Sequence, residues 1–251
     1  MAIVEWRKDG TVAILTMNNA ENRHNPEWSE AMLNAYEEIL ADSEIKALVL
    51  TSSDPKYFCL GVDTDWLFKT MNEDDWPTLN KWLYQNTKVF TAMLMAPFPT
   101  IAAINGHAFG NGFMLAGACD FRFMRADRGF ICFPEIDLGI QLAPSMLEWM
   151  KRIMPYHIFQ RMLLSGEKMG AAEAEKYNII VKACENAEKT LEEAVAYART
   201  FNKSRATMAE MKRRAYKHVM DKMANEDPVY FDYKPEQVKE GKAPIFMFTF
   251  S

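Results

Sequence analysis

Two glycine-containing segments follow apolar runs. Each could expose main-chain N–H groups that bind a negatively charged or polarised oxygen. Residues 58–63 read FCLGVD, and residues 104–113 read INGHAFGNGF. Glycine permits close backbone approach and positive φ. A helix N-terminus presents free N–H groups at the positive end of its dipole. The second segment therefore predicts either an oxyanion-binding turn or a tight strand-to-helix turn that needs glycine only for its geometry.

Other kinds of site are disfavoured by residue spacing. The glycines do not fit the G-x-G-x-x-G pattern of dinucleotide sites, so no nicotinamide cofactor is expected. No cysteine pair has C-x-x-C spacing, so neither a metal site nor a disulfide framework is expected. Reduced thiols in a cytoplasmic protein are the simplest interpretation. The cysteines are Cys59, Cys119, Cys132 and Cys184.

The elements that would position these segments alternate between strands and helices. Asn25 and Pro26 are typical of a helix start, as a cap and a first helical residue. Thr190 with Glu193 has the spacing of a capping box. Short apolar runs predict strands at residues 13–17, 47–50, 57–62, 101–104, 121–124 and 130–133. Further helices are predicted at residues 77–95, at 110–118 and over much of the chain from Pro144 onward. This order predicts an α/β fold with a core at 1–201 and a helical region at 202–251.

Composition limits the class of protein. The chain has 251 residues, of which 49% are hydrophobic and 25% charged, as in ordinary globular proteins. A net charge of -5 disfavours a nucleic-acid partner. No apolar run has membrane-spanning length and the N-terminus has no apolar signal region, so we expect a cytoplasmic protein without membrane contact.

Four motifs in a fixed order resemble the crotonase (enoyl-CoA hydratase/isomerase) superfamily over roughly residues 10–185. They are FCLGVD (58–63), AAINGHAFGNGFMLAGACDFRF (102–123), FPEIDLGI (133–140) and LSGEKMGAAEAEKYNIIV (164–181). The resemblance implies a spiral of ββα turns with C-terminal helices for oligomerisation and active-site cover. It also implies an acyl-CoA thioester substrate, a homotrimer or dimer of trimers, and no cofactor, since coenzyme A is part of the substrate.

Two backbone amides are implied by the resemblance as the donors that hold the thioester carbonyl. They are the N–H groups of Val62 and Asn111. The family often has glycine at the second position, but asparagine still donates its N–H and tolerates unusual φ. The residues expected to contact substrate are Cys59, Leu60, Gly61, Gly110 and Met114.

The acid–base residues distinguish reactions within the superfamily. The superfamily's hydratases use two glutamates. In this chain, the residue that corresponds to the first is Met114, and the residue that corresponds to the second is Glu135. One carboxylate suffices for a 1,3-proton shift, so the chain resembles the Δ3,Δ2-enoyl-CoA isomerases most. Ala143 stands where dienoyl-CoA isomerases have an aspartate. The alternatives are a hydratase or another single-base reaction, and a non-catalytic acyl-CoA-binding or RNA-binding homologue.

The remaining polar candidates are expected mainly to have structural or solvent-exposed roles. We expect a packed or hydrogen-bonded His107 and solvated carboxylates at Asp63 and Asp65. For His24, a capping or surface role and contact with the ligand are equally expected. A solvated helix face is expected for the basic cluster of Lys212, Arg213, Arg214 and Lys217.

Overall fold

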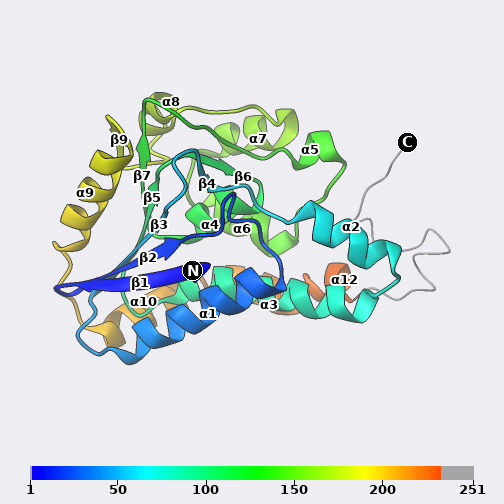
Figure 1. Ribbon diagram of the computed structural model, residues 1–251, viewed down its shortest axis with the longest axis horizontal. Helices are drawn as coiled ribbons and strands as arrows, with labels where there is room; N and C mark the ends of the chain where they lie inside the picture. The colour runs from blue at the N-terminus through cyan, green and yellow to red at the C-terminus, as the bar shows by residue number, and fades with distance from the viewer. Residues whose placement is uncertain (1, 233–251) are drawn as a thin grey trace.

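The computed structural model describes residues 2–232 and contains two β-sheets (Figure 1). The larger sheet has six strands in the order β1-β2-β3-β5-β7-β9, and only the β1–β2 pair is antiparallel. The smaller sheet has the order β4-β6-β8 and is parallel. The strands are β1 (Val4–Asp9), β2 (Val12–Met17), β3 (Ala47–Ser52), β4 (Tyr57–Cys59), β5 (Thr100–Ile104), β6 (His107–Phe109), β7 (Phe121–Arg125), β8 (Ile131–Cys132) and β9 (Lys182–Cys184).

Successive turns of the chain send one strand into each sheet. β3, β5 and β7 lie in the larger sheet, and the strand that follows each of them, β4, β6 or β8, lies in the smaller one. A helix follows each strand pair. This repeat is the ββα spiral that the sequence resemblance implies, so the predicted fold class is confirmed. It also places the ends of β4, β6 and β8 side by side, and the glycine segments leave from β4 and β6.

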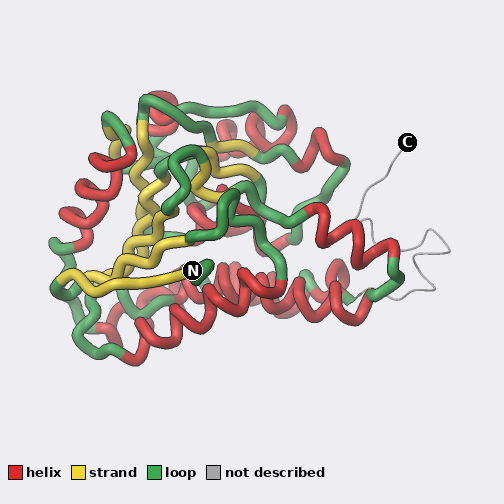
Figure 2. Tube along the Cα trace, viewed as in Figure 1, coloured by secondary structure: helices red, strands yellow, loops and turns green. Residues whose placement is uncertain are grey.

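Helices cover both faces of the larger sheet (Figures 1 and 2). α9 packs on one face against β3, β5 and β7, while α1 and α3 run side by side beneath the other. The helices are α1 (Pro26–Ala41), α2 (Thr64–Asn72), α3 (Trp76–Met95), α4 (Asn111–Ala118), α5 (Glu135–Leu138), α6 (Pro144–Lys151), α7 (Tyr156–Ser165), α8 (Ala171–Lys176), α9 (Ala187–Ala198), α10 (Arg205–Ala215), α11 (Lys217–Asn225) and α12 (Pro228–Phe231).

The central strands are apolar because they are buried on both faces. In β2, Ala13 and Leu15 belong to the main hydrophobic core, whereas Val12 and Ile14 belong to the core beneath α9. Every residue of β3 is buried. Such continuous apolar runs are typical of parallel strands covered by helices on both sides.

Helix starts were predicted with mixed success. Asn25 caps α1 by accepting a hydrogen bond from the Trp28 N–H at 2.9 Å, with Pro26 as the first helical residue, as expected. The capping box at Thr190 was wrong. α9 begins at Ala187, and its cap is Asn186, which accepts from the Lys189 N–H at 3.0 Å. Both residues suit a cap, but only Asn186 has the extended backbone that the position requires.

Two polar residues for which a solvent-exposed role was expected or left open, Lys212 and His24, are buried. Lys212 is 5% exposed, and its ammonium donates to an Asp120 carboxylate oxygen at 2.6 Å, although Arg213, Arg214 and Lys217 are solvated as expected. His24 is fully buried, and its ring stacks on Trp28 with centroids 3.8 Å apart. Sequence periodicity places a residue on a helix face, but it does not show which faces another element covers.

The sequence reading also missed elements. The elements that were not predicted are β1, α2, β6, α5 and β9, and β4 ends at Cys59 rather than at residue 62. β1 alternates buried and exposed positions only weakly, which gives little period-2 signal. The predicted boundary between 201 and 202 stays a prediction, and part of the predicted helical region, residues 233–251, lies outside the described residues.

Candidate active site

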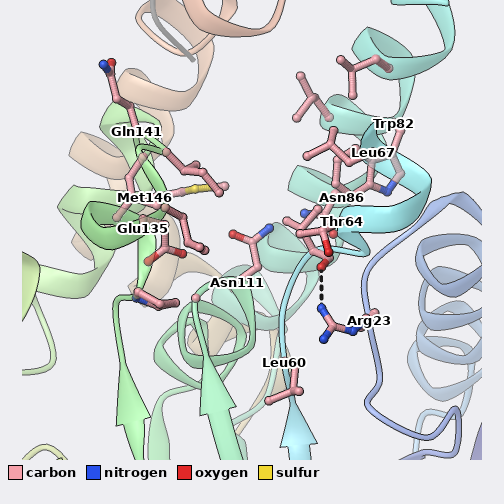
Figure 3. A pocket seen from close by; sticks show the side chains of 18 of the residues that line it. Arg23, Leu60, Thr64, Leu67, Trp82, Asn86, Asn111, Glu135, Gln141 and Met146 are labelled. Atoms are coloured by element: carbon pink, nitrogen blue, oxygen red, sulfur yellow. Dashed lines mark hydrogen bonds between the residues drawn. The ribbon is translucent and has the colours of Figure 1, made fainter. Parts of the chain in front are cut away.

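A cavity of about 140 Å³ opens where α4, α5 and the turn after β4 meet α2 and α3 (Figure 3). One wall carries Glu135 and Met146, and the opposite wall carries Leu67, Trp82 and Asn86. Asn111 rises between them. The lining is mostly apolar with a few convergent polar groups, which is the composition of small-molecule sites.

Glycine brings the two predicted amide segments into contact. Gly61 has φ +80°, and a Cβ built on it would lie 3.0 Å from the Asn111 nitrogen. A Cβ on Gly112 would lie 2.0 Å from the Cys59 carbonyl oxygen. Both positions therefore exclude a side chain, and their backbones approach closely because none is present.

The two predicted donor amides are free. Asn111 is the first residue of α4, where no carbonyl of the preceding turn is available. Val62 and His24 form an isolated parallel β-bridge. Its hydrogen bonds involve the residues before and after Val62, and they leave the Val62 N–H unused. His24 N–H donates to the Gly61 carbonyl at 2.7 Å, and Asp63 N–H donates to the His24 carbonyl at 2.9 Å. Within residues 2–232, neither the Val62 N–H nor the Asn111 N–H has an acceptor.

His24 braces this segment as a neutral group. Its Nε2 lies 3.1 Å from the Cys59 sulfur, and burial lowers the pKa of His24 to about 3. Burial also raises the pKa of the Cys59 thiol to about 12. The pair is therefore an uncharged structural contact and not an activated thiolate.

Glu135 is the first residue of α5 and faces the cavity. It is 7% exposed, and its Oε2 has no hydrogen-bond partner among the described residues. A Cβ on Gly110, which has φ +54°, would lie 2.6 Å from Glu135 Oε1. Burial raises the pKa of Glu135 to about 7, since removing a carboxylate from water disfavours its charged form. This carboxyl has the pKa expected of a general base at neutral pH.

The structure brings together most, but not all, of the residues predicted for the site. Leu60, Val62, Gly110, Asn111 and Glu135 line the cavity, and Gly61 lies against Asn111.

Cys59 and Met114, which were also expected to contact substrate, do not line the cavity, because both side chains are fully buried in the hydrophobic core. Met114 lies on α4, which is enclosed on all sides, and its carbonyl accepts from the Trp149 indole N–H at 3.2 Å.

The other polar residues considered from the sequence, His107, Asp63 and Asp65, do not line the cavity. His107 packs against the rings of Tyr57, Phe109 and Phe130, as expected for a packed histidine. Asp63 is not simply solvated, because it caps α2 by accepting from the Trp66 N–H at 3.1 Å. Asp65 is exposed, as expected.

The C-terminal helices complete the cavity, which sequence reasoning did not foresee in detail. Phe231 of α12 lines it and stacks edge-on against Tyr84 of α3 at 5.5 Å between centroids. Asp227, just before α12, accepts hydrogen bonds from the Ser145 N–H at 3.0 Å and from the Ser145 hydroxyl. No local motif marks these partners, since they are 82 residues apart.

Comparison with known proteins identifies the family. The family model described as "Enoyl-CoA hydratase/isomerase" matches residues 7–238. The chain therefore belongs to the enoyl-CoA hydratase/isomerase family, and it is an acyl-CoA enzyme of the crotonase superfamily.

Curated relatives include both isomerases and hydratases. The chain is 29% identical to Arabidopsis thaliana enoyl-CoA delta isomerase 3 over 74% of its length and 79% of the relative's. It is 30% identical to the short-chain-enoyl-CoA hydratase of Clostridium acetobutylicum over 72% of its length and 68% of the relative's. The relatives support the family without separating its reactions.

Solved structures confirm the fold. A probable enoyl-CoA hydratase from Mycobacterium tuberculosis superposes with a TM-score of 0.83 at 20% identity, covering 95% of this chain and 98% of that one. An enoyl-CoA hydratase from Bacillus halodurans gives 0.81 at 22% identity, with 98% and 96% covered.

Within residues 2–232, no cluster of three or more His, Cys, Asp or Glu side chains is placed to hold a metal ion. No helix in the same part of the chain is long and apolar enough to cross a membrane.

Proposed function

We propose that this chain isomerises 3-enoyl-CoA thioesters to 2-trans-enoyl-CoA thioesters by a 1,3-proton shift. One observation carries the proposal. Among the described residues that line the cavity, Glu135 is the only carboxylate. The position at which the family's hydratases have a second glutamate is Met114, whose side chain is buried and cannot titrate.

The thioester carbonyl oxygen accepts hydrogen bonds from the N–H groups of Val62 and Asn111. Removal of a proton from C2 places negative charge on that oxygen, and fixed donors in a dry site stabilise it. Each such donor contributes about 10²–10³ in rate. The double bond moves from C3–C4 to C2–C3 when the proton is returned at C4.

Glu135 is the carrier of that proton. Its carboxylate takes the proton from C2, holds it as the neutral acid, and delivers it to C4 on the same face of the dienolate. Because the pKa of Glu135 is about 7, both forms are accessible at neutral pH. The free enzyme requires the ionised form, so kcat/KM should rise as the pH passes upward through about 7.

Hydration is the second candidate, favoured by the hydratase relatives. Hydratases of this family orient and split water with two carboxylates, and the described cavity offers one. A purely binding role, for acyl-CoA or RNA, gives no purpose to Glu135, whose Oε2 has no hydrogen-bond partner among the described residues.

Several related predictions from the sequence accompany the proposal. The proposed proton shift uses no metal or redox cofactor. Coenzyme A enters as part of the substrate. A homotrimer or dimer of trimers and a cytoplasmic location stay predictions.

The test is label transfer in 3-hexenoyl-CoA that carries deuterium at C2. We expect 2-trans-hexenoyl-CoA with part of the deuterium at C4, detected by mass spectrometry and NMR. Unchanged substrate, or 3-hydroxyhexanoyl-CoA as the main product, would reject the proposal.

A further inference from the structure

The cavity contains polar side chains that the proton shift does not use. They belong to Thr64, Asn86, Asn111 and Gln141. Within residues 2–232, the side chains of Thr64, Asn111 and Gln141 have no hydrogen-bond partner in the protein. Asn86 is 2% exposed, and its carboxamide already interacts with the buried His24 ring, so it is not free to pair with a ligand. Thr64 and Gln141 are at least partly open to solvent, whereas Asn111 is only 9% exposed. A plain hydrocarbon acyl chain would desolvate the Asn111 carboxamide and leave it unpaired, which is unfavourable.

Asn111 is the best placed of the four to contact the acyl chain. The Asn111 N–H is one of the two free amides proposed to bind the thioester carbonyl. The Asn111 side chain therefore starts next to the part of the acyl chain that reacts. Figure 3 shows its carboxamide reaching into the cavity between Glu135 and the wall that carries Thr64 and Asn86. Glycine would supply the same N–H, so the oxyanion site alone does not account for the carboxamide.

The charges around Asn111 limit the chemistry of its partner. A carboxamide offers both a donor and an acceptor. Arg23 is the only cationic residue in the described lining, and its guanidinium already pairs with Glu21 at 2.6 Å and with the Val62 carbonyl at 3.3 Å. Glu135 on the facing wall would repel an acyl carboxylate. A neutral oxygen-bearing group fits best.

We propose that Asn111 selects acyl-CoA substrates whose acyl chain carries a neutral hydrogen-bonding group, a hydroxyl or an oxo group, beyond the thioester. This inference rests on the proposed function for the seating of the thioester. It does not depend on which reaction follows.

The test measures binding of unreactive ligands, so turnover is not required. The dissociation constants of hexanoyl-CoA and its 4-oxo and 5-oxo derivatives are measured by calorimetry. In the wild type, we expect the better oxo ligand to bind about tenfold more tightly than hexanoyl-CoA. The ratio of affinities within one variant cancels any change at the carbonyl site.

Two substitutions at Asn111 assign the preference. Asn111→Leu keeps the N–H and the approximate size, and Asn111→Gly keeps the N–H in case the first variant does not fold. We expect the affinity ratio to fall to about one in either. Thr64→Val removes another polar group from the same cavity and should keep the ratio.

The outcomes separate the two proposals. If the wild type binds hexanoyl-CoA and its oxo derivatives equally well, the proposed selection of polar acyl chains is overturned. This result is expected if Asn111 only binds a water molecule. An unchanged ratio in Asn111→Leu, or its loss only in Thr64→Val, overturns the assignment to Asn111. Failure of label transfer from C2 to C4 rejects the isomerase and leaves the binding preference to be judged separately.

Discussion

Two buried carboxylates lie near the same cavity and have opposite hydrogen bonding. Asp227 is fully buried, and both of its oxygens accept from Ser145. Glu135 is nearly as buried, but its Oε2 has no partner among the described residues. Burial raises the pKa of both, and the hydrogen bonds from Ser145 oppose the shift at Asp227.

The difference separates a structural acid from a reactive one. The residue before α6 is Ala143, which has no side-chain acceptor, and Asp227 instead supplies an acceptor to the first turn of that helix. This contact also anchors α12, which carries Phe231 to the cavity. Within residues 2–232, Glu135 Oε2 accepts no hydrogen bond, and the side chain faces the space that the substrate would fill. An unpaired buried acid in a cavity is a functional candidate, whereas a paired one is better explained by the fold.

The largest expected effect is on turnover in Glu135→Gln. Glutamine keeps the shape and removes the base, so kcat for 3-hexenoyl-CoA should fall by about 10³ or more. Binding of hexanoyl-CoA should survive and serves as the control. Near-wild-type turnover would remove Glu135 from the mechanism.

The next effect concerns the Asn111 amide. Asn111→Pro deletes the N–H, and Asn111→Gly retains it. Proline is tolerated at the first position of a helix, so folding should persist. We expect kcat/KM to fall by about 10²–10³ in the proline variant relative to the glycine variant. Equal losses in the two variants would point away from the amide.

Stability should depend on pH through Glu135. Its pKa rises from 4.5 to about 7 on folding, so the folded state binds the proton more tightly. The resulting stabilisation is complete below about pH 4.5 and is lost as the pH rises through 7. Between pH 5 and 8, the wild type should therefore lose on the order of 2–3 kcal/mol relative to Glu135→Gln. Urea unfolding of both proteins at the two pH values measures this, and parallel pH dependence would contradict it.

Asp227→Ala should act on stability more than on chemistry. It leaves the Ser145 N–H and hydroxyl without their acceptor, at a cost of about 1–3 kcal/mol in the free energy of unfolding. Asp227→Asn retains an acceptor and should lose less. Calorimetric melting of the three proteins checks the order. A stable Asp227→Ala variant that lacked turnover would assign Asp227 a role in catalysis instead.

Local sequence patterns predicted the parts of the site that are local. The glycine segments and Glu135 sit within short motifs whose order along the chain is diagnostic, and the structure places Val62, Asn111 and Glu135 around one cavity. The apolar runs predicted most strands because buried parallel strands have few polar residues.

Long-range contacts could not be predicted in this way. The Asp227–Ser145 contact joins residues 82 apart, and Lys212 pairs with Asp120 across 92 residues. The burial of His24 and the enclosure of Met114 likewise depend on which helices pack together. A single sequence gives periodicity within each element but does not give these pairings.

The most direct test of the single-base account compares two reactions of the wild-type protein on matched chains. The values of kcat/KM are measured for isomerisation of 3-hexenoyl-CoA and for hydration of 2-trans-hexenoyl-CoA, in the same buffer at pH 8. With Glu135 as the only carboxylate in the described lining, isomerisation should be faster by about tenfold or more. Hydration as fast as isomerisation, or faster, would contradict the account.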